Sequence, residues 1–575
     1  MSRRILIAML IIAAIIFIIS LFLWIVFPLI FPILADANLA LTEGNDGMPS
    51  TSTFFWSKPP INAVMNFYFF NITNPDEVIY EGAKPSLQQL GPFAIRYSEQ
   101  KTEYQFTADG SEVYYKNYKR YSFERELSCD YCHEDSPLTI PNAVAIGALN
   151  NMVDPKYQCD VTCRTLIDIG LLLLGENPFR TVKFMEVMFD GYNDPFLTFV
   201  HSDFYTLLCD LFNDGEPLVP FPIPDMELMA YFSGYNNSND EDYIIKTGKA
   251  NIEEMGAVVQ WAGARGLPHN WWITPQARMI NGSDSGNFNH PRLSKNDVLP
   301  FFLSLLCRSF YATYSGETTV SGIRSYTFET PYEVFDATLD ENRGFRYENA
   351  ERVNYFKEWD PCPNKTTFHN CSLLPFVDCS KRRNFCSECC DGNYVDGTYL
   401  LPPGMFPLKC YPGKTEILPF SLIFSAPHWV YSPPVVLNTV HGLSPSRQRH
   451  IPFVFAHEPI SGMLTRAQVR LMASVPIFRN LETTIAKDVI DVLVPIFWID
   501  ADVKVRDTTL STIRSTFVVL LRAILIAKIV TLAVSVFLAC FATGCIIRQK
   551  LRRRQAAHHG NSKIVYGGIK NSSSY

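Results

Sequence analysis

Two long uncharged segments, one near each end, constrain this chain more than any other feature. Residues Ile5–Leu34 run for thirty positions without a charged side chain, and Ile529–Ile547 run for nineteen. About twenty apolar residues in a helix cross the hydrocarbon core of a bilayer, so both segments are long enough. The first is also much longer than the apolar core of a cleaved signal peptide, which has about 7–15 residues. We therefore predict two transmembrane helices, at residues 5–34 and within 517–547.

Each uncharged segment is bordered by basic residues on the side nearer to its end of the chain. Arg3 and Arg4 precede the first segment, and from Arg548 to Tyr575 there are seven Lys or Arg and no acid. Basic residues beside a span remain in the cytosol. Removing these nine positive charges from the net charge of −7 leaves −16 for residues 5–547. The predicted topology has a cytosolic N-terminus (1–4), a basic cytosolic tail (548–575) and a large domain (35–516) outside the cytosol.

The cysteines and glycosylation sequons of the middle region favour the same topology. Thirteen of the fifteen cysteines lie between Cys129 and Cys410, as expected for a domain in an oxidising compartment. Five sequons also fall in this region, whereas a sixth, at Asn571, lies in the predicted cytosolic tail. The predicted glycosylation sites are Asn71, Asn236, Asn281, Asn364 and Asn370.

Short runs of β-branched and aromatic residues between Asn, Pro, Gly and Asp predict strands through much of the middle region. Clear examples are Ala63–Phe70, Gly322–Phe328 and Val492–Trp498. Helical patterns are fewer, and residues 361–413 have the composition of a Cys-rich insertion held by disulfides. We expect an α+β domain with a mixed antiparallel sheet. The expected helices are Val161–Gly175, Thr181–Phe189, Asp297–Tyr311 and Thr465–Ala473.

The sequence Cys129-Asp-Tyr-Cys132-His133 is open to several interpretations. It matches a haem attachment motif and a redox dithiol, and together with two later cysteines it could form a zinc site. Disulfides that tie this segment down fit the oxidising compartment better. We therefore expect neither a metal nor a cofactor. The cysteines expected in structural disulfides here are Cys129, Cys132, Cys159 and Cys163.

The expected helix at Val161–Gly175 is apolar on nearly all sides. Such a helix is either buried in a core or exposes an adhesive surface, and the residues alone leave both possibilities open. One of its faces carries Leu166, Ile169, Gly170 and Leu173, and another carries Ile167, Leu171 and Leu174. The candidate lipid-contacting residues are Leu166, Ile169, Gly170, Leu171, Leu173 and Leu174.

A series of short motifs stands in order from about residue 60 to 500. They are FNITNPDEV at Phe70–Val78, LGPF at Leu90–Phe93, GYNDPF at Gly191–Phe196, MINGSD at Met279–Asp284, CRSFY at Cys307–Tyr311, APHW at Ala426–Trp429, HEPISGM at His457–Met463 and VPIFW at Val494–Trp498. With a span at each end, this ordered set resembles the class B scavenger receptor family, which includes lysosomal integral membrane protein and insect sensory neuron membrane proteins.

The resemblance implies a large antiparallel β-barrel with an apical helical bundle between the two spans. It also implies that the helical end binds lipids, lipoproteins or protein partners, and that a hydrophobic tunnel leads lipid toward the membrane. Two disulfides follow from it, Cys307 with Cys410 and Cys362 with Cys371. Because thirteen outer cysteines is an odd number, one is free or bridges to another chain, and we expect this to be Cys209.

The charge of the expected apex differs from that of relatives that capture anionic particles, which carry a basic cluster there. Between Asn142 and Val200 there are four basic and seven acidic residues, a net charge of −3. A negative surface repels anionic ligands. We therefore expect neutral lipids or lipoprotein-like particles as ligands, with a basic protein partner as the alternative. A homo-oligomer is a further possibility.

Two features near the C-terminus concern trafficking. Cys540 and Cys545, near the inner end of the second span, fit either palmitoylation or ordinary apolar packing. Tyr566-Gly-Gly-Ile569 matches a tyrosine-based endocytic sorting signal. We expect the chain in the plasma membrane, or in an endosomal or lysosomal membrane.

The sequence contains no G-x-S-x-G elbow, phosphate-binding glycine loop, H-E-x-x-H or kinase motif set. His428 lies beside Pro427 and Trp429, where we expect it to form structural hydrogen bonds. A receptor that facilitates lipid uptake is therefore the favoured function, and neither catalysis nor nucleic-acid binding is expected. A protein-binding receptor for trafficking, for recognition of pathogens or dying cells, or for adhesion is the second hypothesis. A redox enzyme using Cys129 and Cys132 is the third.

Overall fold

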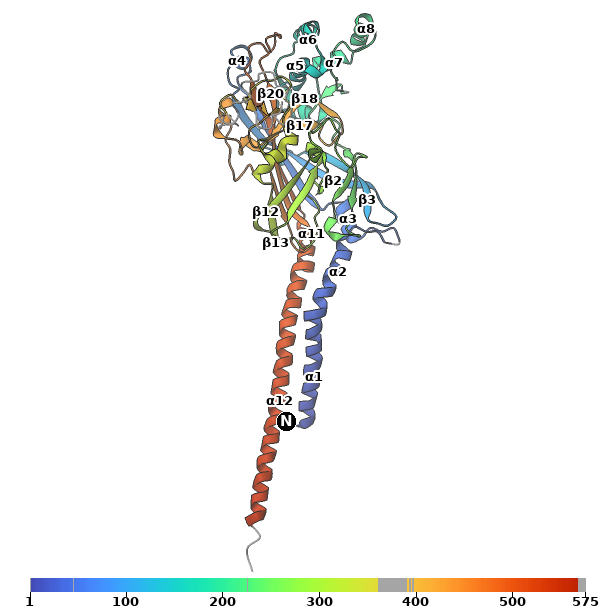
Figure 1. The fold of residues 1–575 in the computed structure, drawn as a ribbon, viewed down its shortest axis with the longest axis vertical. Helices are drawn as coiled ribbons and strands as arrows, with labels where there is room; N and C mark the ends of the chain where they lie inside the picture. The colour runs from blue at the N-terminus through green and yellow to red at the C-terminus, as the bar shows by residue number, and fades with distance from the viewer. Residues whose placement is uncertain are drawn as a thin grey trace, which may run out of the picture. The chain divides into compact units, whose positions relative to one another are not determined.

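The computed structural model describes the chain except residues 1, 45, 225, 360–389, 392–393, 396–397 and 567–575. It consists of two compact units. The first unit comprises Met1–Asn38 and Ser511–Tyr575, and the second comprises Leu39–Leu510. Long helices form the first unit, and the strands lie in the second (Figure 1).

The first unit is a pair of apolar helices that pack against each other. Arg3–Leu39 and Leu520–Ala556 each contain 37 residues and are apolar enough to cross a membrane. The predicted spans are therefore both helical and long enough to cross. The elements are α1 (Arg3–Leu21), a π-helical turn (Phe22–Val26), α2 (Phe27–Leu39), α11 (Asp507–Ile513), a π-helical segment (Arg514–Val519) and α12 (Leu520–Tyr566).

Lys528 makes polar contacts between the two long helices. The ammonium group of Lys528 in α12 lies 5.4 Å from the ring centroid of Trp24, which is an ordinary cation–π distance. The indole nitrogen of Trp24 also donates a hydrogen bond to the carbonyl oxygen of Lys528, at 3.4 Å. Trp and Lys are typical of the headgroup level of a membrane, where each keeps its polar group hydrated.

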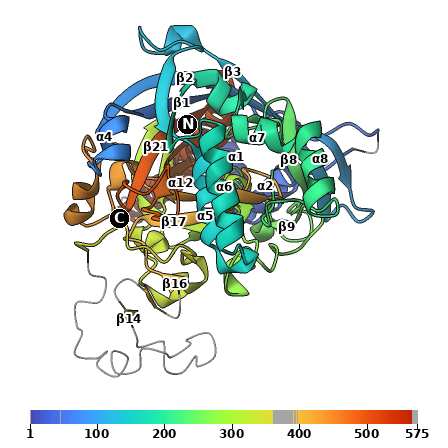
Figure 2. The same ribbon diagram turned by 90° about the horizontal axis from the view of Figure 1, so that it is seen from above.

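The second unit is built around one large, nearly closed sheet (Figures 1 and 2). Along its path the strands run β10-β11-β12-β13-β19-β20-β21-β1-β2-β3-β8-β9, and β18, paired with β17, branches from β20. All these pairs are antiparallel except β10–β11. A bridge between Ala257, beside β9, and Ser283 of β10 connects the two ends of the path. The predicted α+β class with a large antiparallel β-barrel is confirmed.

The strands of the large sheet are β1 (Ile61–Ile72), β2 (Leu87–Phe106), β3 (Glu112–Phe123), β8 (Ser238–Lys246), β9 (Val258–Trp261), β10 (Ser283–Asp284), β11 (Val298–Leu303), β12 (Arg308–Val320), β13 (Ile323–Glu329), β17 (Met405–Cys410), β18 (Ile417–Ser425), β19 (Phe453–His457), β20 (Leu464–Ile477) and β21 (Val492–Val505). Small sheets pair β4 (Pro137–Pro141) with β5 (Phe179–Lys183), β6 (Tyr192–Asn193) with β7 (Leu228–Met229), and β14 (Cys390–Asp391) with β15 (Tyr394–Val395) and β16 (Thr398–Tyr399).

Helices α5, α6, α7 and α8 lie together at the end of the second unit that lies away from α3, and we call this the helical end (Figure 1). Of these, α5 packs against β18. Close packing requires Gly147, because a Cβ atom there would lie 2.9 Å from the Cβ of Phe420. The helices of the unit are α3 (Thr51–Ser57), α4 (Pro75–Tyr80), α5 (Ala143–Val153), α6 (Val161–Leu173), α7 (Pro195–Val200) and α8 (Asp203–Phe212).

Several sequence predictions of secondary structure are confirmed and others are wrong. The strands expected at 63–70, 322–328 and 492–498 are β1, β13 and β21, and the helix expected at 161–175 is α6. Residues 465–473 form part of β20 instead of a helix, and residues 297–311 form β11 and the start of β12. In the latter segment Pro300 disfavours a helix, because it lacks a backbone N–H. Residues 181–189 are divided between β5 and a helical segment.

Candidate functional site

Helix α6 is fixed at its start by a cap and a disulfide. The side chain of Asp160 accepts a hydrogen bond from the backbone nitrogen of Cys163 at 2.8 Å, which satisfies one of the unpaired N–H groups of the first turn. Cys159 and Cys163 form a disulfide beside this cap. Further along, Asp168 accepts hydrogen bonds from the backbone nitrogen and the hydroxyl of Thr484, at 2.6 and 2.9 Å. The helix is therefore held in place both at its first turn and near its middle.

The apolar residues of α6 divide into a buried and an exposed face. Ile167 and Leu171 are buried in the core, whereas Leu166, Ile169 and Leu173 are 58, 47 and 81% exposed. Gly170 and Leu174 are half-buried. Of the six candidate lipid-contacting residues, Leu171 is completely buried and packs in the core instead of facing solvent. Leu166, Ile169 and Leu173 form an apolar surface that faces solvent at the helical end.

The sequence analysis missed a second helix with an exposed apolar face. In α8, Tyr205 and Cys209 are buried, and Cys209 carries a free thiol, as the odd cysteine count led us to expect. The sequence did contain signals for this helix, because Ser202 is a good N-cap and apolar residues recur three and four positions apart. Its exposed large apolar residues are Phe204, Leu207, Leu211 and Phe212.

Among the residues that the structure describes, three disulfides join cysteines of the second unit. They are Cys129–Cys132, Cys159–Cys163 and Cys307–Cys410, with Cα atoms 5.0, 5.3 and 6.4 Å apart. Within the described residues no group of three or more His, Cys, Asp or Glu side chains is arranged to hold a metal ion. The four cysteines of the first two disulfides thus pair locally instead of forming one site. Cys362 and Cys371 lie outside the described residues.

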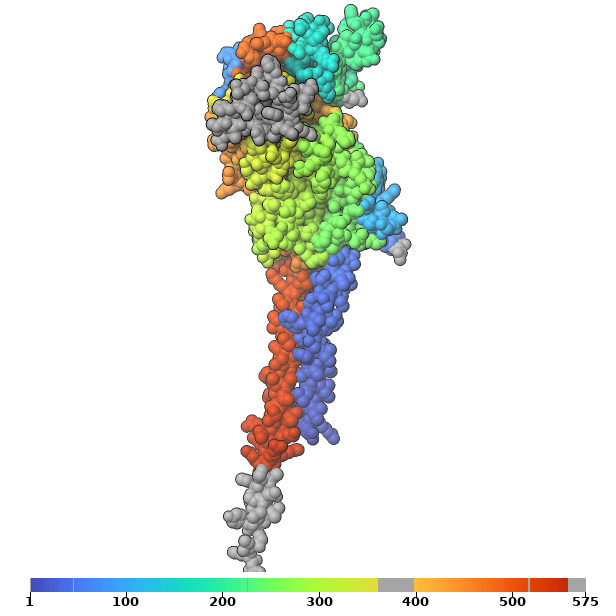
Figure 3. Space-filling model, viewed as in Figure 1, coloured from blue at the N-terminus to red at the C-terminus, as the bar shows by residue number. Residues whose placement is uncertain are grey.

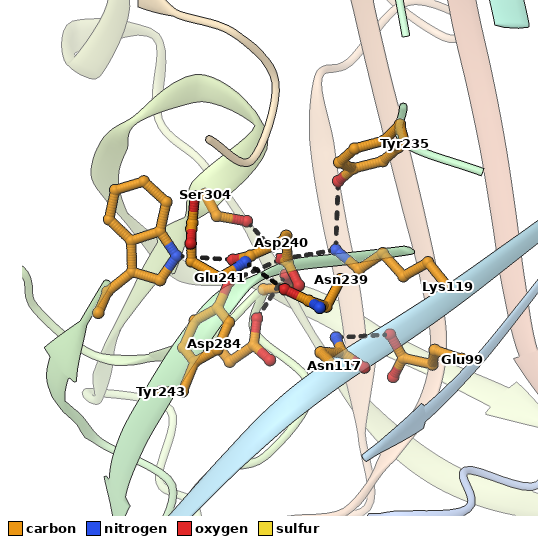
Figure 4. Close-up of polar contacts among 12 residues, drawn as sticks. Glu99, Asn117, Lys119, Tyr235, Asn239, Asp240, Glu241, Tyr243, Asp284 and Ser304 are labelled. Carbon is orange, nitrogen blue, oxygen red and sulfur yellow. Dashed lines mark hydrogen bonds and ion pairs between the residues drawn. The ribbon is translucent and has the colours of Figure 1, made fainter. Parts of the chain in front are cut away.

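A layer of charged and polar side chains lies in the interior of the large sheet (Figure 4). Lys119 of β3 pairs with Asp240 of β8, with Nζ and Oδ2 2.7 Å apart. The hydroxyls of Tyr243 and Ser304 donate to the same carboxylate oxygen, each at 2.7 Å. All four side chains are buried. Hydrogen bonds within the protein therefore replace water at Oδ2 of Asp240, whereas its buried Oδ1 has no hydrogen-bond partner among the described residues.

Neighbouring strands extend this layer. On β2, Nζ of Lys101 lies 2.6 Å from Oε1 of Glu99, and Asn117 of β3 donates to the other carboxylate oxygen at 3.2 Å. The hydroxyl of Tyr115 donates to Oδ2 of Asp284 in β10 at 2.9 Å. We call the ionic layer the set Glu99, Lys101, Asn117, Lys119, Asp240 and Asp284.

The ionic layer lies between two apolar clusters. Along β3 the inward side chains Val113 and Tyr115 belong to the smaller cluster, and Tyr121 belongs to the larger one. Asn117 and Lys119 stand between them on the same face of the strand. Moving an acyl chain past buried charges would cost free energy, because their hydrogen bonds would be disturbed. Any lipid path inside the sheet would therefore stay within the larger cluster.

The charges in the layer shift each other's pKa. Burial raises the pKa of Glu99, but the ammonium groups of Lys101 and Lys119 outweigh burial and lower it to about 2. Burial has the largest single effect on the pKa of Lys119 and lowers it, but Asp240, Tyr235 and Tyr121 together outweigh burial and raise it well above its usual value. Glu99 and Lys119 are therefore charged at every physiological pH.

His428 forms structural hydrogen bonds, as expected from the sequence. Its Nε2 lies 2.8 Å from Oε1 of Gln89, and the backbone nitrogen of Ser444 donates to its Nδ1 at 3.1 Å. The two rings of His428 and His450 stack with centroids 4.5 Å apart. Burial, and next the charge of His450, lowers the pKa of His428 to about 3. Burial, and next the charge of Arg470, lowers the pKa of His450 to about 4. Both rings are neutral at physiological pH.

The predicted glycosylation sites differ in accessibility. Asn281 is exposed. Asn71 and Asn236 are half-buried, and each side chain is already hydrogen-bonded. Oδ1 of Asn71 accepts from the backbone nitrogen of Thr139 at 2.8 Å, and the amide of Asn236 exchanges two hydrogen bonds with the backbone of Tyr121. Asn364 and Asn370 lie outside the described residues.

The trafficking candidates lie in and after α12. Cys540 is exposed on this helix and Cys545 is half-buried, and both thiols are free. Tyr566 is the last residue of α12, and Ile569 lies outside the described residues. Exposure of Cys540 is compatible with acylation, because an enzyme must reach the sulfur.

Comparison with known proteins agrees with this architecture. The chain is 38% identical to an uncharacterised protein of Caenorhabditis elegans over 538 residues, which is 93% of this chain and 96% of the relative. It is 25% identical to mouse lysosome membrane protein 2 over 482 residues, 84% of this chain and 82% of the relative. It is 23% identical to mouse scavenger receptor class B member 1 over 505 residues, 87% of this chain and 82% of the relative.

A family model also matches almost the whole chain. Residues 9–546 match the CD36 family, and this range includes most of both terminal helices and the whole of the second unit. The resemblance to class B scavenger receptors inferred from the sequence motifs is confirmed. A nearly closed antiparallel sheet, two terminal apolar helices and a match across almost the entire sequence all lead to one conclusion: the chain belongs to the CD36 family.

Proposed function

We propose that this protein is a scavenger-type receptor that binds neutral lipids or lipoprotein-like particles at the exposed face of α6. The observation that carries the proposal is the outward position of Leu166, Ile169 and Leu173 on a helix whose other face is anchored in the core. Apolar side chains of this size remain exposed at a free energy cost unless a ligand covers them. The net charge of −3 around the apex disfavours anionic particles.

Bound lipid would then move through the interior of the sheet toward the membrane. The larger apolar cluster supports this route, because it includes Leu171 of α6 and Leu464 at the start of β20, and Val503 near the end of β21 packs against it. Moving an acyl chain from an apolar environment into water costs about 0.8 kcal/mol per methylene. A sixteen-carbon chain therefore faces a free energy barrier of roughly 12 kcal/mol to transfer through water. A continuous apolar interior would remove most of that barrier.

The proposed setting is the plasma membrane or an endosomal or lysosomal membrane, with both chain termini in the cytosol. The basic residues beside each span favour this orientation. A protein-binding receptor remains the second candidate, because an acidic apex also suits a basic partner.

Binding of a fluorescent neutral-lipid emulsion to the full chain in nanodiscs tests the proposal. The triple variant Leu166→Ser, Ile169→Ser, Leu173→Ser should lose most of the binding, because it removes the apolar surface without touching the core. Thr162→Ala, an exposed polar position on the same helix, is the matched control and should bind like the wild type. Equal binding by the triple variant would refute the proposal.

A further inference from the structure

The two long helices of the first unit place their basic ends at one level. Helices α1 and α12 pack against each other and run in opposite directions (Figures 1 and 3). Between them, Trp24 contacts Lys528. Arg4 precedes Trp24 by twenty residues, and Arg548 follows Lys528 by twenty residues. At about 1.5 Å per helical residue, Arg4 and Arg548 both lie roughly 30 Å along the helices from this contact.

That distance matches the thickness of a bilayer, whose hydrocarbon core spans about 30 Å. Trp and Lys are residue types of the headgroup level, so Trp24 and Lys528 suit the surface of one leaflet. No charged side chain lies between either residue and the basic end of its helix. In a bilayer, Arg4 and Arg548 would therefore lie at the headgroup level of the other leaflet.

Seven exposed basic residues gather at this level, and we call them the basic collar. The sequence of the first unit contains a single Asp or Glu, Asp36, which is more than thirty residues from Arg4. No acidic side chain of this unit is therefore close enough to neutralise the collar. The basic collar consists of Arg3, Arg4, Arg548, Lys550, Arg552, Arg553 and Arg554.

Two arginines of the collar continue the face of α12 that packs on α1. Ser535 and Ala542 are buried and Gln549 is half-buried, so a stripe that repeats every seven residues marks this face. Arg552 and Arg553 follow Gln549 by three and four positions and extend the stripe. The space-filling view shows α12 running past the start of α1 (Figure 3). Both arginines are exposed there, on a face that α1 no longer covers.

The composition of the collar favours phosphate as its ligand. Six of its seven residues are Arg, whose planar guanidinium group donates two parallel hydrogen bonds to a phosphate. The five collar residues of α12 fall within seven positions, which is about 9 Å of helix. Phosphatidylserine brings one net negative charge per headgroup, whereas two phosphomonoesters on one headgroup bring roughly three to four. A polyvalent headgroup therefore matches this density of cations better.

We propose that the basic collar binds a phosphoinositide, an inositol lipid that carries phosphomonoesters. Arg552 and Arg553 donate paired hydrogen bonds to the phosphomonoesters, and the other cations of the collar add electrostatic attraction. This site lies in the first unit and is separate from neutral-lipid binding at α6. It rests on the proposed function only for its leaflet, because cytosolic chain ends place the collar against the cytosolic leaflet.

Native mass spectrometry of the full chain tests the proposal. The protein is released from detergent micelles that contain equal amounts of phosphatidylinositol bisphosphate and phosphatidylserine. The bisphosphate lipid should bind about tenfold more tightly than phosphatidylserine, because it brings more negative charge to one place. In a second arm, an equal amount of soluble inositol trisphosphate is added. It should not displace the lipid, because it has no acyl chains to hold it at the level of the collar.

Three double variants identify the contacts. Arg552→Gln with Arg553→Gln should weaken binding of the bisphosphate lipid about tenfold. Arg552→Lys with Arg553→Lys keeps both charges but loses the paired hydrogen bonds, so its binding should lie between that of the Gln variant and that of the wild type. Arg514→Gln with Arg522→Gln is the matched control, because it removes the same charge from exposed positions before the other end of the span. This control should bind the lipid like the wild type.

Equal binding of the two lipids, undiminished binding by the Gln variant at 552 and 553, or an equal loss in the control variant would overturn the proposal. Displacement of the lipid by inositol trisphosphate would also overturn it, because the ligand would then be a soluble phosphate. None of these substitutions lies in α6, so a failure of neutral-lipid binding is recognised separately by the α6 triple variant.

Discussion

Lys119 of β3 and Asp240 of β8 form an ion pair inside the large sheet, with Nζ and Oδ2 2.7 Å apart. The two residues are separated by more than a hundred positions in sequence, and the pairing of β3 with β8 brings them together. Their layer separates two apolar clusters that would otherwise be continuous along β3. The ion pair therefore helps to separate the two apolar clusters, and it also affects the stability of the protein.

Removing one partner of this pair should destabilise the protein strongly. Lys119→Met leaves the carboxylate of Asp240 buried without its cation, which costs about 3–5 kcal/mol of unfolding free energy. Adding Asp240→Leu removes the uncompensated charge and should recover part of that loss, although the hydroxyls of Tyr243 and Ser304 lose their acceptor. Denaturant unfolding of the single and double variants measures this coupling. A double variant less stable than Lys119→Met would contradict the role of the pair.

The stacked histidines should make stability fall in acid. Their folded pKa values, about 3 for His428 and about 4 for His450, lie below the usual 6.5. Below pH 6.5 the unfolded chain takes up protons at these rings and the folded chain does not, so stability is lost as pH falls. By pH 4.5 each ring accounts for about 2 kcal/mol.

His450→Gln tests this pH dependence. Glutamine can still accept the hydrogen bond that the backbone nitrogen of Ser446 donates to Nδ1 of His450 at 3.1 Å, but it does not titrate. Melting temperatures at pH 7.5 and pH 4.5 give the loss for each protein. The variant should lose less stability over this range than the wild type, by about 2 kcal/mol. Identical losses would show that His450 takes up a proton in the folded state.

Asn281 should carry a glycan if the second unit lies outside the cytosol. Its side chain is exposed, so the transferase can reach it without disturbing the sheet. Asn281→Gln should raise the electrophoretic mobility by the equivalent of one glycan, and Asn571→Gln should leave it unchanged. A protein that endoglycosidase treatment does not shift would contradict the topology.

The sequence predicted the features that depend on local pattern. The two uncharged segments, the strands at 63–70 and 492–498 and the helix at 161–175 are all visible in short windows. The expected helix at 465–473 was wrong because Ala, Leu and Arg are good helix formers, yet the segment lies in β20, which pairs with β19 on one side and β21 on the other. Arg466 and Arg470 face the partner strand, where they pair with Asp502 and Asp500 at 2.6 and 2.8 Å. Pairing with a neighbouring strand on each side favours a strand over the intrinsic propensity.

Long-range features could not be predicted from the sequence. The ionic layer combines side chains of β2, β3, β8 and β10, and no local pattern indicates that Lys119 would lie beside Asp240 and not in solvent. The same holds for α6, where both faces are apolar and only packing decides that Leu171 is buried and Leu166 exposed. Helix α8 is different, because its amphipathic pattern was present in the sequence.

Uptake of a fluorescent neutral lipid by cells that express this protein tests the central claim most directly. The variant with Ser at positions 166, 169 and 173 should reach the same membrane at the same level as the wild type but take up lipid at a rate close to that of untransfected cells. The Thr162→Ala control should take it up at the wild-type rate. If the triple variant transfers lipid as fast as the wild type, the exposed face of α6 is not where lipid enters.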